Sequence, residues 1–504
     1  MSTPSDNSVD DTPISSFFRH PTGILLTDLD KARFDKEIPL LEHQVRYFDE
    51  QSALLVSRRD QVTLSLAMRR SALAPVWHLP PDVLREIFSQ VAADHDSIDL
   101  SGGPWTLGQV CAPWRDLVLD TPLVWSRPTL KGVYTSQSLH VLAEYLRRSR
   151  DCPLHIRAMF FVHHPQSAIL DLHEAVFKVL ITSSSRWKFV CFVIPMEFLK
   201  HISALCGKMP LLEEARIHLC TYYRHNPDGV EWRHLFSNVP SLRKISLDGP
   251  LFSEHMLTGN HITHFAGYVD RPGALRTIFK FPALVECHLW YRGSGTGSLQ
   301  SPIRHDRIKY LAVNTTRVLA VLTLPSLKHL EIDEQYERNE CVCAEAMSAF
   351  MDRSSFHLRS LSMTCRSFRT QLIQPYYMQM VEDFAITIHT SATLVAMFSP
   401  TRCDLFPKLR RLHIRLSSKV YLSKDHVLLL VNFIRERLDE AKSVALDVEK
   451  LDKVQISSSV PSYLDEFRKC GFDEFEIGVL TVDPQLHYLE LRNPPWFDHA
   501  IVAD

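Results

Sequence analysis

The chain has 504 residues, of which 45% are apolar and 23% are charged, and its net charge at pH 7 is −2. This length suffices for roughly two to four domains with substantial cores. The near balance of charge excludes the strong basic field typical of nucleic-acid-binding proteins and any acidic bias. We therefore expect a globular protein whose partners are other proteins, with no nucleic acid among them.

The N-terminal residues are polar and lack the apolar stretch of a signal peptide. No run of about 18 apolar residues predicts a transmembrane helix, so we expect no membrane partner. The 11 cysteines have no recurring spacing, and most lie inside apolar runs, which is typical of free thiols in a reducing compartment. These features predict a protein of the cytoplasm, the nucleus or both.

The first two segments of the chain differ sharply in composition. Residues 1–36 are rich in Ser, Thr, Asp and Pro, which predicts a disordered arm. Residues 37–74 contain no glycine and one proline, Pro39, which we place near the start of a long amphipathic helix, where proline is tolerated. Pro75 then ends this helix.

Within the predicted helix, apolar residues recur at alternating steps of three and four, as in the seam of a coiled coil. Polar residues at Ser52, Arg59 and Arg69 interrupt this seam. Two interpretations stay open: the helix packs on the body of the protein, or the seam over 38–73 mediates self-association. The apolar seam residues are Ile38, Leu41, Val45, Phe48, Leu55, Val62, Leu66 and Leu73.

A compact helical module is expected over residues 75–130, and residues 76–130 gather four tryptophans and six prolines. In HLPPDVLREIF at 78–88, two prolines predict an extended start, and Asp82 suits the first turn of a helix. In TLGQVCAPWRDLVLDTPLVW at 106–125, the apolar residues between Leu107 and Val118 follow helical spacing on one face. The segment therefore predicts a bundle of two or three helices.

Residues 131–504 repeat a short phrase of the form apolar–Pro–x–Leu–x–x–apolar–x–apolar. The proline ends the preceding segment, and the alternating apolar residues after it predict a short strand with one buried face. Helix-like stretches such as residues 427–441 lie between copies, and longer insertions occur at 222–229 and 292–302. The prolines of the phrase are Pro210, Pro240, Pro282, Pro325 and Pro407, and a copy at 355–363 lacks one.

A strand with a return helix buries its apolar face only when such units stack on one another. The repeated phrase therefore predicts an irregular leucine-rich-repeat-like α/β solenoid over residues 131–504. A non-repetitive α/β domain that reuses the phrase is the alternative.

The phrases LPPDVLREIF, L-x-x-V-C-x-x-W-R-x-L and P-L-V-W, spread over residues 79–125, resemble an F-box. In particular they resemble the F-box-like modules common in mushroom-forming (basidiomycete) fungi. There a Leu- and Arg-rich helix ends at a proline before the module, and irregular leucine-rich repeats follow. The resemblance implies an α/β chain: a long N-terminal helix, a small helical F-box bundle and an irregular leucine-rich-repeat-like solenoid.

The resemblance also implies a function without chemistry of its own. F-box modules dock to the Skp-type linker of a cullin-based ubiquitin ligase, and the repeats that follow hold a protein substrate, here unknown. The resemblance assigns ten residues to this docking, and some of them will belong to the core of the module instead. They are Leu79, Pro80, Leu84, Ile87, Phe88, Val110, Cys111, Trp114, Leu117 and Trp125.

One segment departs from the family pattern. Residues 92–105, between the expected helices, replace the usual compact turn with a polar stretch that contains Gly102 and Gly103. This departure keeps a second hypothesis open, in which the chain is a leucine-rich-repeat interaction scaffold outside any ubiquitin ligase. The other unusual residues of this segment are Asp94, His95, Asp96 and Asp99.

No motif points to an enzyme, a cofactor or a metal. The glycine-rich residues 293–298 lack the spacing of a phosphate-binding loop, and Pro302 follows where a helix is needed. Cysteine and histidine pairs at 341–343, 163–164 and 261–264 lack a second ligand pair at metal-binding spacing. The basic run at 147–150 we interpret as the favourable charge at a helix C-terminus.

Overall fold

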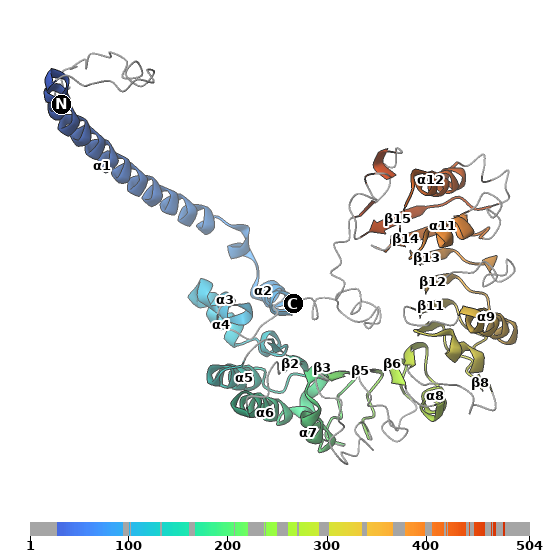
Figure 1. Cartoon of the computed structure of the whole chain (residues 1–504). Helices are drawn as coiled ribbons and strands as arrows, with labels where there is room; N and C mark the ends of the chain where they lie inside the picture. Colours follow the sequence, from blue (N-terminus) through green and yellow to red (C-terminus); the bar gives the residue numbers. More distant parts are fainter. Residues whose placement is uncertain are drawn as a thin grey trace. The chain divides into compact units, whose positions relative to one another are not determined.

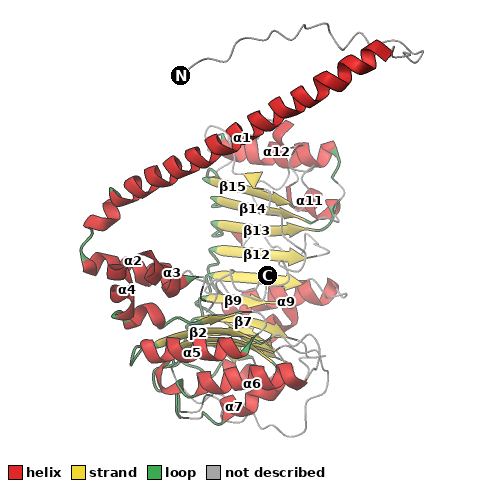
Figure 2. Ribbon diagram, turned by 90° about the vertical axis from the view of Figure 1, so that its left-hand side faces the viewer, coloured by secondary structure: helices red, strands yellow, loops and turns green. Residues whose placement is uncertain are grey.

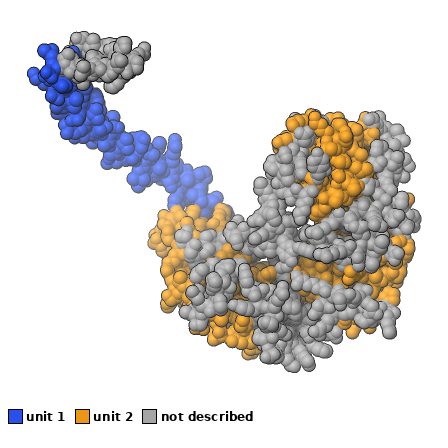
Figure 3. All heavy atoms as spheres, in the orientation of Figure 1, with its two compact units in different colours: residues 1–84 blue, residues 85–504 orange. Residues whose placement is uncertain are grey.

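A computed structural model describes the chain in two compact units, residues 1–84 and 85–504 (Figure 3). The chain is mixed α/β, with a long N-terminal helix and a large open parallel sheet (Figure 1). None of the described helices is long and apolar enough to span a membrane. Apart from one or two positions inside these ranges and a few isolated residues, the structure describes residues 28–93, 102–131, 134–160, 167–219, 238–248, 261–269, 272–291, 302–334, 340–365, 378–398, 406–439 and 448–458.

Several sequence predictions fall outside the described residues. They concern residues 1–27 of the arm expected over 1–36, whose residues 28–36 are helical, the acidic part of the segment between the module helices at 94–99, the histidine pair at 163–164 and the glycine-rich residues 293–298. The proposed domain boundaries at 74/75 and 130/131 stay predictions.

The N-terminal helix, α1, spans Asp28–Ala72 in 45 residues. It begins ahead of the expected residue 37, and ion pairs one turn apart, Lys31–Asp28 at 3.5 Å and Arg33–Glu37 at 2.7 Å, stabilise its first turns. The prediction that Pro39 lies near the helix start is therefore wrong. Pro39 lies in the helix interior, where its ring removes one backbone hydrogen bond.

Short helices follow α1. The turn η2 (Pro75–His78) starts at the proline that was expected to end α1. The module then contains α2 (Pro81–Ala93), α3 (Gly103–Val110), α4 (Ala112–Leu119) and η3 (Pro122–Trp125).

Among the described residues, fourteen strands form one parallel sheet whose order follows the chain from β1 to β16. Figure 2 shows the strands lying side by side with their arrowheads on the same side. Two further strands, β8 (Ile303–Arg304) and β10 (Leu322–Thr323), pair separately. The sheet strands are β1 (Thr129–Leu130), β2 (Leu154–Met159), β3 (Trp187–Ile194), β4 (Glu214–Leu219), β5 (Lys244–Asp248), β6 (His264–Val269), β7 (Glu286–Tyr291), β9 (Tyr310–Val313), β11 (His329–Glu334), β12 (Ser360–Cys365), β13 (Asp383–Ile388), β14 (Arg411–Leu416), β15 (Lys453–Ser458) and β16 (Ile477–Gly478).

Helices connect many of these strands and lie along one side of the sheet (Figure 1). They are α5 (Ser136–Arg148), α6 (Ser167–Ile181), α7 (Leu199–Ser203), α8 (Pro272–Ile278), α9 (Glu340–Ser354), α11 (Ser391–Phe398) and α12 (Lys424–Leu438), with 3-10 turns η4 (Ser184–Arg186), η5 (Met196–Phe198) and η6 (Thr316–Val321).

Each proline-containing copy of the repeated phrase forms a tight turn and then a strand. In the first copy the amide of Leu212 donates to the carbonyl of Met209 at 3.3 Å, which places Pro210 second in a four-residue turn. Both Met209 and Leu212 are buried, and β4 begins four residues after the proline. The four other proline-containing copies have the same turn, hydrogen bond and spacing, before β5, β7, β11 and β14.

Strand periodicity then separates two faces of the sheet. In β4, Ala215 and Ile217 are buried toward the helices, whereas Glu214 and His218 on the opposite face are only half-buried. Because the strands are in register, the same alternation recurs from β4 to β15. One face is thus the apolar core and the other carries mostly polar side chains.

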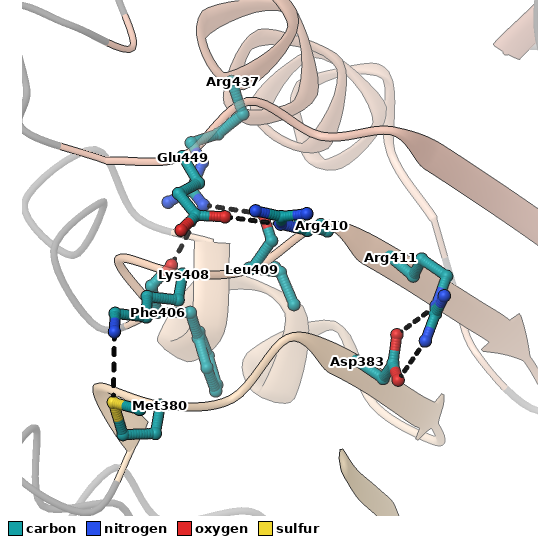
Figure 4. Close-up of polar contacts among 9 residues, drawn as sticks. All are labelled: Met380, Asp383, Phe406, Lys408, Leu409, Arg410, Arg411, Arg437 and Glu449. Carbon is teal, nitrogen blue, oxygen red and sulfur yellow. Dashed lines mark hydrogen bonds and ion pairs between the residues drawn. The ribbon is translucent and has the colours of Figure 1, made fainter. Parts of the chain in front are cut away.

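A buried arginine ties α12 to the turn before β14 (Figure 4). Arg437 is fully buried, and its Nη2 donates to the carbonyl oxygens of Phe406 at 2.9 Å and Leu409 at 3.1 Å. Close by, Arg410 pairs with Glu449 at 2.6 Å. Arg437 thereby supplies a buried donor to the Leu409 carbonyl and a second donor to the Phe406 carbonyl, which also accepts from the amide of Leu409.

We expect Arg437→Met to lower the free energy of unfolding of the second unit by roughly 2–4 kcal/mol, because the Leu409 and Phe406 carbonyls lose a buried, charged donor. Urea denaturation followed by circular dichroism measures this. Arg435→Met, at an exposed position of the same helix, is the matched control and should cost under about 0.5 kcal/mol. Equal losses in the two variants would contradict the structural role of Arg437.

Candidate docking module and binding face

The segment over residues 79–125 is folded around aromatic residues. The rings of Phe88 on α2 and Trp114 on α4 lie 4.7 Å apart between centroids. Trp125 is almost fully buried, and its Nε1 donates to the carbonyl of Val118 at 2.9 Å. This bond holds η3 against the end of α4.

The same cluster continues into α5. The ring of Trp125 lies 5.2 Å from that of Tyr145, and the guanidinium of Arg148 lies 4.4 Å from the centre of the Trp125 ring. Trp105 completes the cluster, 5.1 Å from Trp125. Cation–π contacts of this kind add to the apolar burial, so the module and α5 share a core.

The expectation of one continuous apolar face from Leu107 to Val118 is wrong. Cys111 is extended, with φ −160° and ψ 168°, and separates α3 from α4. Pro113 explains the break, because a proline there cannot donate to the preceding turn and suits only the start of a new helix. As a result Val110, at the end of α3, is 50% exposed.

The structure divides the ten predicted docking residues by burial. Leu79, Pro80 and Leu84 belong to the first compact unit, and the others belong to the second. Leu84, Phe88 and Trp125 are buried; Leu79, Cys111, Trp114 and Leu117 are half-buried; Pro80, Ile87 and Val110 are exposed.

Helix α2 carries apolar residues on two faces. Leu84, Phe88 and Ala92 are buried at i, i+4 and i+8. Ile87 and Val91 form a second row at the same spacing and are 39% and 44% exposed. A helix with a packed row and an exposed apolar row has one face available for a partner.

Further exposed aliphatic residues of the module were not singled out from the sequence. Leu119 at the end of α4 is 39% exposed and Leu123 in η3 is 46% exposed. With Ile87, Val91 and Val110 they make up what we call the outer aliphatic set. The i, i+4 spacing of Ile87 and Val91 was the sequence signal that could have identified part of it.

The second candidate surface is the polar face of the sheet. In-register pairing places the first outward residue of each strand in one row across the sheet. From β2 to β15 this row reads His155, Phe189, Glu214, Lys244, His264, Glu286, Tyr310, His329, Ser360, Asp383, Arg411 and Lys453.

The centre of this face is a network of histidine, glutamate and aromatic side chains. Glu286 lies 2.7 Å from Nε2 of His288 and 3.5 Å from Nε2 of His264. The ring of His288 stacks on Tyr310 at 4.9 Å, and the Tyr310 hydroxyl donates to Glu331 at 2.6 Å. These contacts hold a polar surface rigid across β6, β7, β9 and β11.

At the next outward-facing position of β6 and β7, the rings of Tyr268 and Trp290 lie 5.7 Å apart. Both side chains are half-buried. Large aromatic residues on a mainly polar surface are typical anchors of protein interfaces, so this part of the face is suited to a polypeptide partner.

Burial makes four histidines of the polar face weaker bases. It lowers the pKa of His155 and that of His413 to about 4, and it also lowers the pKa values of His264 and His329. Burial likewise raises the pKa of Tyr310. At neutral pH these histidines are therefore neutral, and the charges of this face come from its carboxylates, arginines and lysines.

Within the part of the chain that the structure describes, no three His, Cys, Asp or Glu side chains come together to hold a metal ion. The side chains of Cys341 and Cys343 are outside the described set, although their backbone lies in α9.

No protein-family model and no curated protein matches the sequence of this chain.

The lowered histidine pKa values predict a pH-dependent stability. A histidine whose folded pKa lies below its unfolded value of about 6.5 takes up its proton first in the unfolded chain, so stability falls as pH drops below about 6.5. Between pH 7.5 and 5.0 we expect a loss on the order of 1 kcal/mol for each of His155 and His413, reduced by partial exposure. Urea denaturation at the two pH values measures it.

In the double variant His155→Gln, His413→Gln this loss should shrink. His261→Gln, at an exposed position, is the control and should keep the original pH dependence. An unchanged pH dependence in the double variant would show that these two histidines do not contribute.

Proposed function

We propose that this chain is the substrate-recruiting F-box adaptor of a Skp–cullin–F-box ubiquitin ligase. Residues 79–125 dock the Skp-type linker, and the repeats bind a protein substrate. The observation that carries the proposal is the double apolar pattern of α2, the helix that opens with the LPPD phrase. Its inner row is packed in the module, and its outer row, Ile87 and Val91, is exposed.

The outer aliphatic set gives this docking its driving force. Covering a half-exposed Val, Leu or Ile side chain contributes roughly 1 kcal/mol. Phe88, Leu84 and Trp125, which the family resemblance also marks, act indirectly in this proposal, because they are buried and hold the helices in place. The linker contacts are therefore proposed on Ile87, Val91, Val110, Leu119 and Leu123.

We further propose that the sheet and its helices are an irregular leucine-rich-repeat-like solenoid. Three features support this: strand order follows the chain, the helices lie along one side, and the proline turn recurs. Repeat proteins of this kind bind partners on the strand-lined surface. The polar face, with Tyr268 and Trp290 near its centre, is the proposed substrate-binding surface.

The alternative is a repeat scaffold outside any ligase. It uses the same polar face but has no linker, and the unusual segment between α2 and α3 favours it. Action with a cullin would place the chain in the cytoplasm or the nucleus. Binding of the linker decides between the two functions.

We expect the full chain to co-purify with a fungal Skp-type linker, and Ile87→Asp with Val91→Asp to weaken that complex at least about 100-fold, because two charges enter an apolar interface. Isothermal titration calorimetry measures the affinity, and circular dichroism checks the fold. These positions are better probes than Leu84, which is buried.

Leu428→Asp is the matched control, since Leu428 on α12 is 46% exposed and lies outside the module. It should leave linker affinity within about 2-fold of the unmodified chain. Absence of linker binding by the full chain at micromolar concentration would reject the adaptor and favour the scaffold.

A further inference from the structure

Helix α1 exposes an apolar seam along most of its length. Its residues fall at alternating three- and four-residue steps, and none of the eight apolar seam positions is buried. Their exposed fractions run from 45% at Leu41 to 80% at Leu73. At about 1.5 Å per residue the helix is about 67 Å long, so the seam is a long unpartnered surface.

The charges of α1 are segregated along its axis. Residues 28–50 contain seven acidic and four basic side chains, whereas residues 51–72 contain one acidic and four basic ones. The first half therefore has a net charge of −3 and the second half a net charge of +3. The division falls at the middle of the helix, so the helix is complementary to a reversed copy of itself.

These charges border the seam. In the heptad set by the seam, Glu42 and Asp49 each follow directly after an apolar seam residue, and Asp35 holds the same heptad position seven residues before Glu42. In the second half, two arginines, Arg59 and Arg69, occupy the seam itself. Residues beside the seam decide which helices pair, and in which orientation.

We propose that two copies of this chain associate through α1 as an antiparallel coiled coil. In this orientation the acidic half of one helix faces the basic half of the other, and the seam arginines lie beside the partner's carboxylates. A parallel pair would bring acidic half against acidic half and basic half against basic half. This inference is independent of the proposed ligase function.

The charge pattern is also what identifies a second copy as the occupant. An unrelated partner would need a helix of matching length with the complementary distribution of charge. A second, antiparallel copy of α1 already supplies both. Interrupting residues such as Ser52 and the two seam arginines lower the stability of the pair, but they select orientation and register, as polar core residues do in coiled coils.

Adjacent leucines provide a matched test of the seam. Leu55 lies on the seam and Leu54 beside it, and they are 67% and 63% exposed. In sedimentation velocity the full chain should show twice its mass of 58.0 kDa. We expect Leu55→Asp to weaken the dimer roughly 100-fold and Leu54→Asp by less than about 3-fold.

Two measurements test the orientation of the helices, each by whether it weakens or strengthens the dimer. Raising NaCl from 0.05 to 0.5 M should weaken an antiparallel pair, because it screens attraction, and would strengthen a parallel one. The triple variant Asp35→Asn, Glu42→Gln, Asp49→Asn should likewise weaken the antiparallel pair at least about 5-fold. Glu50→Gln, on the outer side of the helix, is the control for the loss of an acidic residue.

A monomer at all concentrations up to about 100 µM would overturn the proposal and point to a seam covered by the same chain. Equal weakening by Leu54→Asp and Leu55→Asp would show non-specific apolar association and would also overturn it. Tightening of the dimer by salt or by the triple variant would overturn the antiparallel orientation. Circular dichroism confirms that each variant keeps α1 helical.

Discussion

The structure of the second unit depends on a small turn that recurs before its strands. In this turn an apolar residue and a leucine three positions later are both buried, and their backbones are joined by a hydrogen bond, as between Met209 and Leu212. Because side chains of a strand alternate between faces, anchoring the leucine decides which residues of the next strand point into the core. A slip by one residue would exchange the apolar core and the polar face.

Much of this arrangement could be predicted from the sequence. All six copies of the phrase precede or enter strands that join one parallel sheet. Strands such as β6 and β13 were missed, because no proline stands four residues before either strand, although buried residues recur at alternate positions in both. Before β13, for example, Val381 donates to Met378 at 3.1 Å, and both are buried. The physical requirement is the buried pair, and proline is only one way to favour the turn.

The docking module shows why a candidate site is harder to predict than a fold. Helical spacing identified the apolar residues of α2, yet Phe88 is buried and Ile87, one position earlier, is exposed. Periodicity reports that a residue is apolar at the right interval, and it says nothing about which of two apolar faces meets the protein's own core. The helix break at Cys111 was readable from Pro113, but the resulting exposure of Val110 depended on three-dimensional packing.

The polar face could not be predicted from single residues, because its members are ordinary side chains far apart in the sequence, such as Glu286 and Tyr310. Only the register of the strands brings them into one row. Composition and motif searches see neither that row nor the network around His288. The register also packs the histidines of this face between neighbouring side chains. This burial is the main cause of their lowered pKa values.

The order of the strands has a consequence for how such a chain folds and evolves. Every pairing in the sheet joins strands that follow one another in the order of the sheet. The paired residues are therefore close in sequence compared with the length of the chain, and the entropy lost on closing each loop is small. Folding can begin at any pair of strands and spread in both directions. Duplication or deletion of one strand with its turn leaves the others with intact neighbours, which lets the length of the polar face change without loss of the fold.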